Sequence, residues 1–125
     1  MAFKNMPTYV IYTNNIDGQH ILPVDTSPPF DMVSEFLNEV PVVPHAHGLE
    51  TEMGPDGQPM GFWTKSGRKG PDYFSLNSRN KKPNQAIFRY HNTKEGLFWF
   101  HDHSMAITRL NVYAGLVGFY EIVDP

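Results

Sequence analysis

The sequence contains no cysteine, and this absence removes several kinds of chemistry at once. The chain can form no disulfide, no thiolate metal site and no cysteine nucleophile. It also cannot build a blue-copper electron-transfer site, because a cysteine sulfur is the defining ligand of such a centre. Any metal held by these residues must be bound by histidine nitrogen and by oxygen.

Long hydrophobic runs and strong charge are missing as well. No stretch reaches the roughly 18 consecutive apolar residues of a transmembrane helix, so we expect no membrane partner. The formal net charge is −3 and no basic block occurs, which argues against nucleic-acid binding. The opening "MAFKNMPTYVIYTNN" has neither an apolar core nor a small-residue cleavage site, and therefore predicts no signal peptide.

What is present predicts one domain, residues 1–125, built mainly from short strands. Eleven prolines and ten glycines divide the 125 residues into short segments. The β-branched and aromatic runs "TYVIYTNN", "QAIFRYHN", "GLFWFHDHS" and "GLVGFYEIVDP" predict strands. Residues 105–115 predict a short helical or 3₁₀ turn, a weak helical turn is expected from Ser34, and residues 21–32 predict an irregular loop. The pattern favours an all-β sandwich or a small barrel.

Four of the six histidines form two His-x-His pairs. His45 and His47 lie in "VVPHAHGLE", and His101 and His103 lie in "FWFHDHSMA". On a strand, residues i and i+2 project from the same face, about 6.6–7 Å apart along the backbone. One such pair alone is more often a surface or hydrogen-bonded feature. Two pairs, each after an extended apolar run, favour a site for one metal ion or for several neighbouring ions.

Other candidate residues remain open alternatives. Glu50 follows the first pair at a spacing that also suits a cupin-type metal site, although the second cupin element is not found. His20 and His91 lie outside the pairs, and we expect them to be structural or exposed. No glycine-rich loop resembles a phosphate cradle, and no catalytic triad is indicated.

The motifs "PHAHG" and "FWFHDHSMAITRLNVYAGLVGFYEIVDP" resemble the amino-terminal cupredoxin domain of multicopper oxidases. "HILPVDTS" and "PDGQPMGFWTKSG" fit the same family, and the resemblance is greatest to bacterial laccases of the spore-coat type. It covers nearly the whole chain, from about residue 9 to Pro125. It implies a cupredoxin-like Greek-key β-sandwich, incomplete at its N-terminal edge. It also implies a location in the spore coat or the cytoplasm.

The resemblance also implies a ligand set. In the family, four His-x-His pairs from the first and last domains surround a trinuclear copper cluster. By position, His45 would bind the type 2 copper, whereas His47, His101 and His103 would bind the type 3 pair. Asp56 matches an acidic residue that serves the cluster's proton and water channel. The alternative, weighed equally, is that Asp56 only forms the Asp-Gly turn.

Neighbours of these ligands have expected supporting roles. Asp102 lies between two ligands on a strand, so it should point away from them and support rather than coordinate the metal. Phe100 should share the face of Asp102, and Phe98 the face of the histidines. Arg109 and Asn111 are expected to form structural hydrogen bonds.

Three functions follow, with different partners. The first is a domain of a laccase-like oxidase, which reduces dioxygen to water while phenolic substrates are oxidised elsewhere in the complete enzyme. This chain alone would lack the type 1 site and be inactive without other domains or chains. The second is a non-enzymatic copper-binding or assembly module, and the third a mononuclear cupin-like or zinc-hydrolase-type enzyme. Because strands of the family fold are missing, an unpaired sheet edge predicts a homo-oligomer or a domain-swapped assembly.

Overall fold

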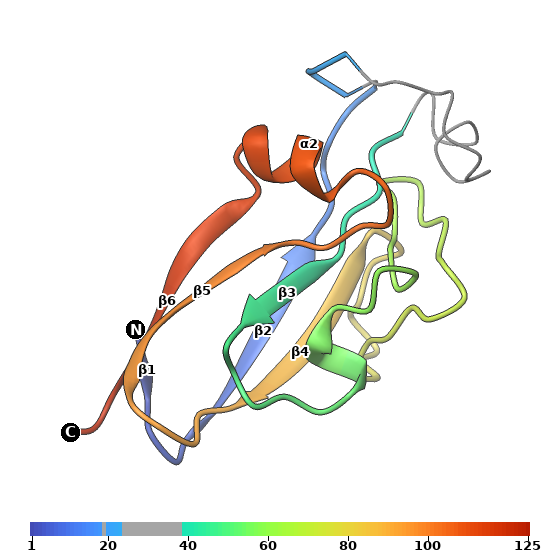
Figure 1. Ribbon diagram of the computed structural model, residues 1–125. Coiled ribbons are helices and arrows are strands. Elements are labelled where there is room, and N and C mark those ends of the chain that lie inside the picture. The colour runs from blue at the N-terminus through green and yellow to red at the C-terminus, as the bar shows by residue number, and fades with distance from the viewer. Residues whose placement is uncertain (19, 24–38) are drawn as a thin grey trace.

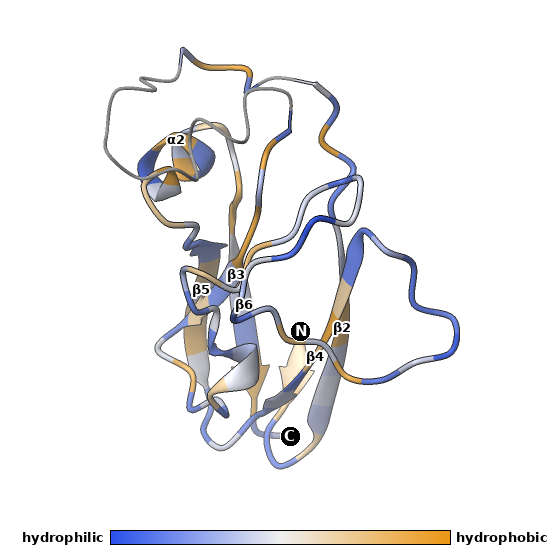
Figure 2. Cartoon of the chain, turned by 90° about the vertical axis from the view of Figure 1, so that its right-hand side faces the viewer, coloured by the Kyte–Doolittle hydropathy of each residue, from blue (hydrophilic) through white to orange (hydrophobic). Residues whose placement is uncertain are grey.

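The computed structural model describes residues 1–18, 20–23 and 39–125, which form two sheets packed face to face (Figure 1). The larger sheet has the strand order β1-β6-β5-β3, and the smaller sheet pairs β2 with β4. Figure 2 shows the two layers side by side, β3, β5 and β6 in one and β2 and β4 in the other. The expected all-β sandwich is confirmed. The helical turn expected from Ser34, and most of the loop expected over 21–32, lie outside the described residues.

The smaller sheet follows directly from alternation in the sequence. Strand β2 (Pro7–Thr13) runs antiparallel to β4 (Gln85–His91). Ala86, Phe88 and Tyr90 are buried on the inner face of β4, as their spacing predicts. Their partners across the sandwich include Trp63, which is fully buried and donates its indole N–H to the Asn84 carbonyl at 2.9 Å.

The larger sheet brings the histidine segments together. Strand β3 (Pro44–His47) pairs antiparallel with β5 (Gly96–Asp102), and β5 pairs antiparallel with β6 (Val117–Val123). A short strand β1 (Ala2–Phe3), which the sequence did not indicate, adds parallel to β6. In the β3–β5 register His45 lies opposite His101, so the two His-x-His pairs become neighbours.

Two short helical elements lie in the connections between strands. The 3₁₀ helix η1 (Gly54–Asp56) lies in the connection after β3, and the helix α2 (Thr108–Tyr113) joins β5 to β6. The expected helical turn in residues 105–115 is thus confirmed. In Figure 1 both chain ends lie at the end of the sandwich opposite α2. No helix among the described residues is long and apolar enough to cross a membrane.

Candidate metal centre

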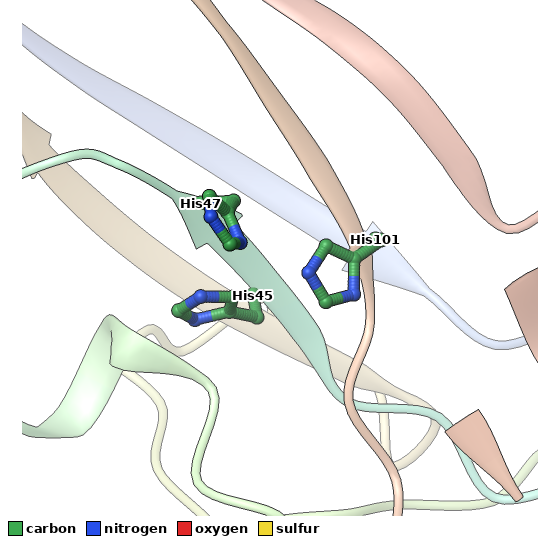
Figure 3. A group of neighbouring side chains, drawn as sticks. All are labelled: His45, His47 and His101. Carbon is green, nitrogen blue, oxygen red and sulfur yellow. The ribbon is translucent and has the colours of Figure 1, made fainter. Parts of the chain in front are cut away.

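Three histidines gather on the outer face of the larger sheet. The ligand nitrogens of His45, His47 and His101 all lie within 4.8 Å of one another, and Figure 3 shows the three rings turned toward a common space. His45 and His47 come from β3 and His101 from β5, so the antiparallel pairing of these strands creates the cluster. Spacing predicted that the two rings of each pair share a strand face, and the family resemblance implied that the two pairs meet.

The fourth predicted ligand, His103, lies just beyond the end of β5. Its ring centroid is 5.0 Å from that of His45 and 5.9 Å from that of His101. It does not belong to the close group of three, but it borders the same space. Its Nδ1 is buried and has no hydrogen-bond partner. Since buried polar atoms are normally paired, this nitrogen is available to a ligand.

Backbone carbonyls determine which ring nitrogens can bind a metal. His45 donates its Nδ1–H to the Asp56 carbonyl at 2.5 Å, and His101 donates its Nδ1–H to the Asp102 carbonyl at 2.7 Å. In each ring the proton is therefore on Nδ1, and the lone pair of Nε2 remains free. Hydrogen bonds of this kind fix the tautomer and orientation of metal-binding histidines.

Electrostatics also favour the neutral, ligating form of His103. Burial lowers the pKa of His103 first, and the nearby rings of His45 and His101 lower it further. A neutral imidazole carries the lone pair that a metal needs. His103 therefore offers a nitrogen donor in the protonation state that suits a metal ion.

Asp56 approaches His45 from the loop above the cluster. Its Oδ1 lies 3.6 Å from His45 Nδ1 and accepts a hydrogen bond from Thr51 Oγ1 at 3.0 Å. Its side chain is 44% exposed and is therefore accessible to solvent. Gly57 allows this approach: its φ is +80°, and a Cβ there would lie 2.5 Å from the Pro44 carbonyl oxygen. Asp56 is thus both a turn residue and a neighbour of the cluster.

One prediction about the neighbours is wrong. Trp99, not Phe98, shares the face of the histidines, with its ring centroid 4.4 Å from His101 and 5.0 Å from His47. Strand parity explains this, because odd-numbered residues of β5 project with His101. The i, i+2 spacing of Trp99 and His101 in the sequence already indicates that the indole lies beside the ligands.

The remaining polar candidates have structural partners. Asp102 is buried and points away from the cluster, as predicted, and accepts hydrogen bonds from Val43 and Ser104. Asn111 is fully buried and bonds to His20. His91 bonds to Glu52 on the surface.

Two further candidates lie apart from the cluster. Arg109 is exposed on α2. The Glu50 carboxylate accepts a hydrogen bond from Thr93 and is absent from the group of neighbouring ligand atoms, which weakens the cupin interpretation.

Comparisons with known proteins agree on one family. The chain is 37% identical over 123 residues to a laccase of Bacillus subtilis (strain 168), covering 98% of this chain and 22% of the relative. It is 34% identical over 115 residues to the multicopper oxidase LPR1 of Arabidopsis thaliana, covering 90% of this chain and 18% of the relative. A laccase of Haloferax volcanii is 33% identical over 132 residues, covering 97% and 21%. No family model matches the sequence.

A solved structure supports the fold. A multicopper oxidase from Campylobacter jejuni, described as a metallo-oxidase, superposes with a TM-score of 0.61 at 16% identity over 98% of this chain and 18% of that one. The chain spans about a fifth of the length of the curated relatives it matches. Copper is the metal that these homologues imply, and the imidazole donors present here suit it. The chain therefore belongs to the multicopper oxidases, as a cupredoxin domain related to those of laccases.

Proposed function

We propose that this chain is a copper-binding domain of a laccase-like multicopper oxidase and supplies half of the histidine ligands of a trinuclear copper cluster. The observation that carries the proposal is the convergence of three imidazoles within 4.8 Å, with a fourth beside them. By the family resemblance, His45 would bind the type 2 copper and the other three histidines the type 3 pair. Copper, when bound, supplies the redox chemistry that reduces dioxygen to water.

The residues of the chain hold and orient the ligands in this proposal. The carbonyls of Asp56 and Asp102 keep His45 and His101 in the tautomer whose Nε2 faces the metal. Trp99 packs against His47 and His101 and limits how far their rings can turn. Asp56, half-exposed beside His45, is placed to pass protons from solvent, which dioxygen reduction consumes. These contacts orient the ligands, pack against their rings and bring a carboxylate beside them.

Other domains or chains would complete the enzyme. A chain without cysteine cannot hold the type 1 copper that receives electrons from phenolic substrates. Four histidines also supply only half of the family's ligand set. We therefore propose that phenol oxidation requires further domains or partner chains, and that the isolated chain is inactive toward a phenolic dye.

A completing partner would also find an open sheet edge. The smaller sheet has two strands against four in the larger one, and among the described residues β2 pairs only with β4. Tyr9 and Ile11 on β2 are each 61% exposed. Unpaired edges of this kind favour association, so we propose that the isolated chain forms oligomers or exchanges strands. Light scattering coupled to gel filtration tests this, and a monomer with a cooperative melt contradicts it.

A copper titration tests the proposed function. Copper should bind saturably, and the double variant His101→Ala, His103→Ala should lose most of the tight component. A control with His91→Gln, whose ring bonds to Glu52 outside the cluster, should bind as the parent does. Preferential recovery of zinc or iron instead of copper would favour the mononuclear alternative. Tight copper binding with no activity after any reconstitution would favour a non-enzymatic copper module.

A further inference from the structure

A buried carboxylate connects the two histidine segments on the side opposite the rings. Asp102 is 3% exposed. Its Oδ1 accepts the Val43 N–H at 2.9 Å and the Ser104 hydroxyl at 3.0 Å, and its Oδ2 accepts the Ser104 N–H at 2.9 Å. Val43 lies two residues before His45, and Ser104 directly follows His103. One side chain therefore bonds to the backbone of both ligand-bearing segments.

His103 depends on this connection more than the other histidines do. Strand β5 ends at Asp102, so no regular ladder pairing extends to His103. Its backbone N–H donates instead to the Val43 carbonyl at 2.8 Å. Both polar backbone groups of Val43 are thus bonded to the segment 102–103. If the Asp102 carboxylate is removed, only one of these two bonds remains.

Buried neighbours fix the other side of the carboxylate network. Asn111 donates from Nδ2 to the Pro41 carbonyl at 3.0 Å, and Ser104 Oγ lies 3.3 Å from the same carbonyl oxygen. His20 accepts the Leu22 N–H at its Nδ1, so its Nε2 carries the proton and donates to Asn111 Oδ1 at 2.9 Å. The segment leading into β3 is therefore held by helix α2 and the residue after His103.

We propose that Asp102 is a positioning residue that holds His103 within reach of the other three imidazoles. The inference rests on the proposed function, because His103 needs this position only if it shares a copper cluster with the other histidines. Without the carboxylate, the Val43 and Ser104 amides would lose their acceptor in a dry interior. The segment before His45 would then separate from the segment that follows β5, and His103 would move away from His45.

Three variants should weaken copper binding to different degrees. Asp102→Ala should weaken tight copper binding about 10- to 100-fold, the range found when groups that orient metal ligands are removed. Asp102→Asn should lie between this variant and the parent, since its amide oxygen replaces one acceptor while its NH₂ faces an N–H donor. Ser104→Ala should change affinity little, because both amides keep their acceptor. Copper affinity is measured by competition with a chelator of known affinity.

A matched control separates positioning from general stability. Asn92 is also buried, and it bonds to the Met6 carbonyl, Thr8 Oγ1 and the Tyr120 hydroxyl on the far side of the sandwich. Asn92→Ala should lower the melting temperature without weakening copper binding. In the metal-free protein, Asp102→Ala should speed hydrogen exchange at the Val43 and Ser104 amides, whereas Asn92→Ala should not.

The outcomes distinguish this inference from the proposed function. Asp102→Ala that binds copper as tightly as Asn92→Ala overturns the positioning role, even if its melting temperature falls. Unchanged exchange at Val43 and Ser104 in both Asp102 variants also overturns it. If the parent chain itself binds no copper through its histidines, the proposed function fails, while the exchange experiment still tests the connection between the two segments.

Discussion

Gly57 directly follows Asp56, whose carbonyl orients His45, and its backbone packs against β3. Its φ of +80° lies in the left-handed region, where an alanine costs about 1–2 kcal/mol. A Cβ at this position would also lie 2.5 Å from the Pro44 carbonyl oxygen and 2.8 Å from His45 Cα. Both atoms belong to the backbone of β3 and cannot move aside cheaply. We expect Gly57→Ala to lower the free energy of unfolding by more than about 2 kcal/mol, and to displace the Asp56 carbonyl from His45.

Gly18 provides the control for this substitution. Its φ is +66°, but nothing lies within 4 Å of an added Cβ. Gly18→Ala should therefore cost only the backbone strain, about 1–2 kcal/mol, and leave copper binding unchanged. Urea unfolding followed by tryptophan fluorescence, to which the buried Trp63 contributes, measures both variants. Equal losses of stability in the two variants, together with unchanged copper affinity in Gly57→Ala, would refute the reasoning from close approach.

Three further predictions test the core, the charge state and the metal. Phe88→Ala should lower the free energy of unfolding by about 3–5 kcal/mol because Phe88 is 2% exposed, whereas Phe119→Ala, at 80% exposed, should change it by less than about 0.5 kcal/mol in the same urea experiment. The pKa of His103 is lowered in the folded state, so the unfolded chain binds more protons as pH falls below its ordinary value. The stability of the metal-free protein should therefore be fully present above about pH 6.5 and decline below it, with a shallower slope in His103→Gln; a steeper slope in the variant would contradict this. Removing copper with a chelator should lower the melting temperature, because copper binds the folded cluster and stabilises it by mass action; no shift at saturating copper would argue against a folded site.

The sequence predicted those features that depend on local periodicity. Alternation in residues 85–91 separates Ala86, Phe88 and Tyr90 from the residues between them, and the structure buries this set, because a strand with one face in the core must alternate. The spacing within each His-x-His pair likewise placed the rings of each pair on one face. The family resemblance then implied that the two pairs lie close together, and the pairing of β3 with β5 places His45 opposite His101.

Features that depend on tertiary contacts were harder to predict. The carbonyl of Asp56 orients His45 from eleven residues away, and nothing in the spacing signals a backbone acceptor. The network around Asp102 joins residues such as Val43 and Asn111 that are distant in sequence. Trp99 was a different case. Strand parity alone places it beside His101, because residues 99 and 101 project from the same face of β5.

We propose that imidazoles from β3 and β5 bind copper in one shared cluster, and the most direct test is pulsed electron paramagnetic resonance on the chain loaded with less than one copper(II) ion per molecule. We expect coupling to more than one imidazole nitrogen, with fewer coupled rings in His47→Ala and in His101→Ala, which come from different strands. Coupling to no imidazole would contradict it. So would a signal that stays unchanged when either strand loses its histidine.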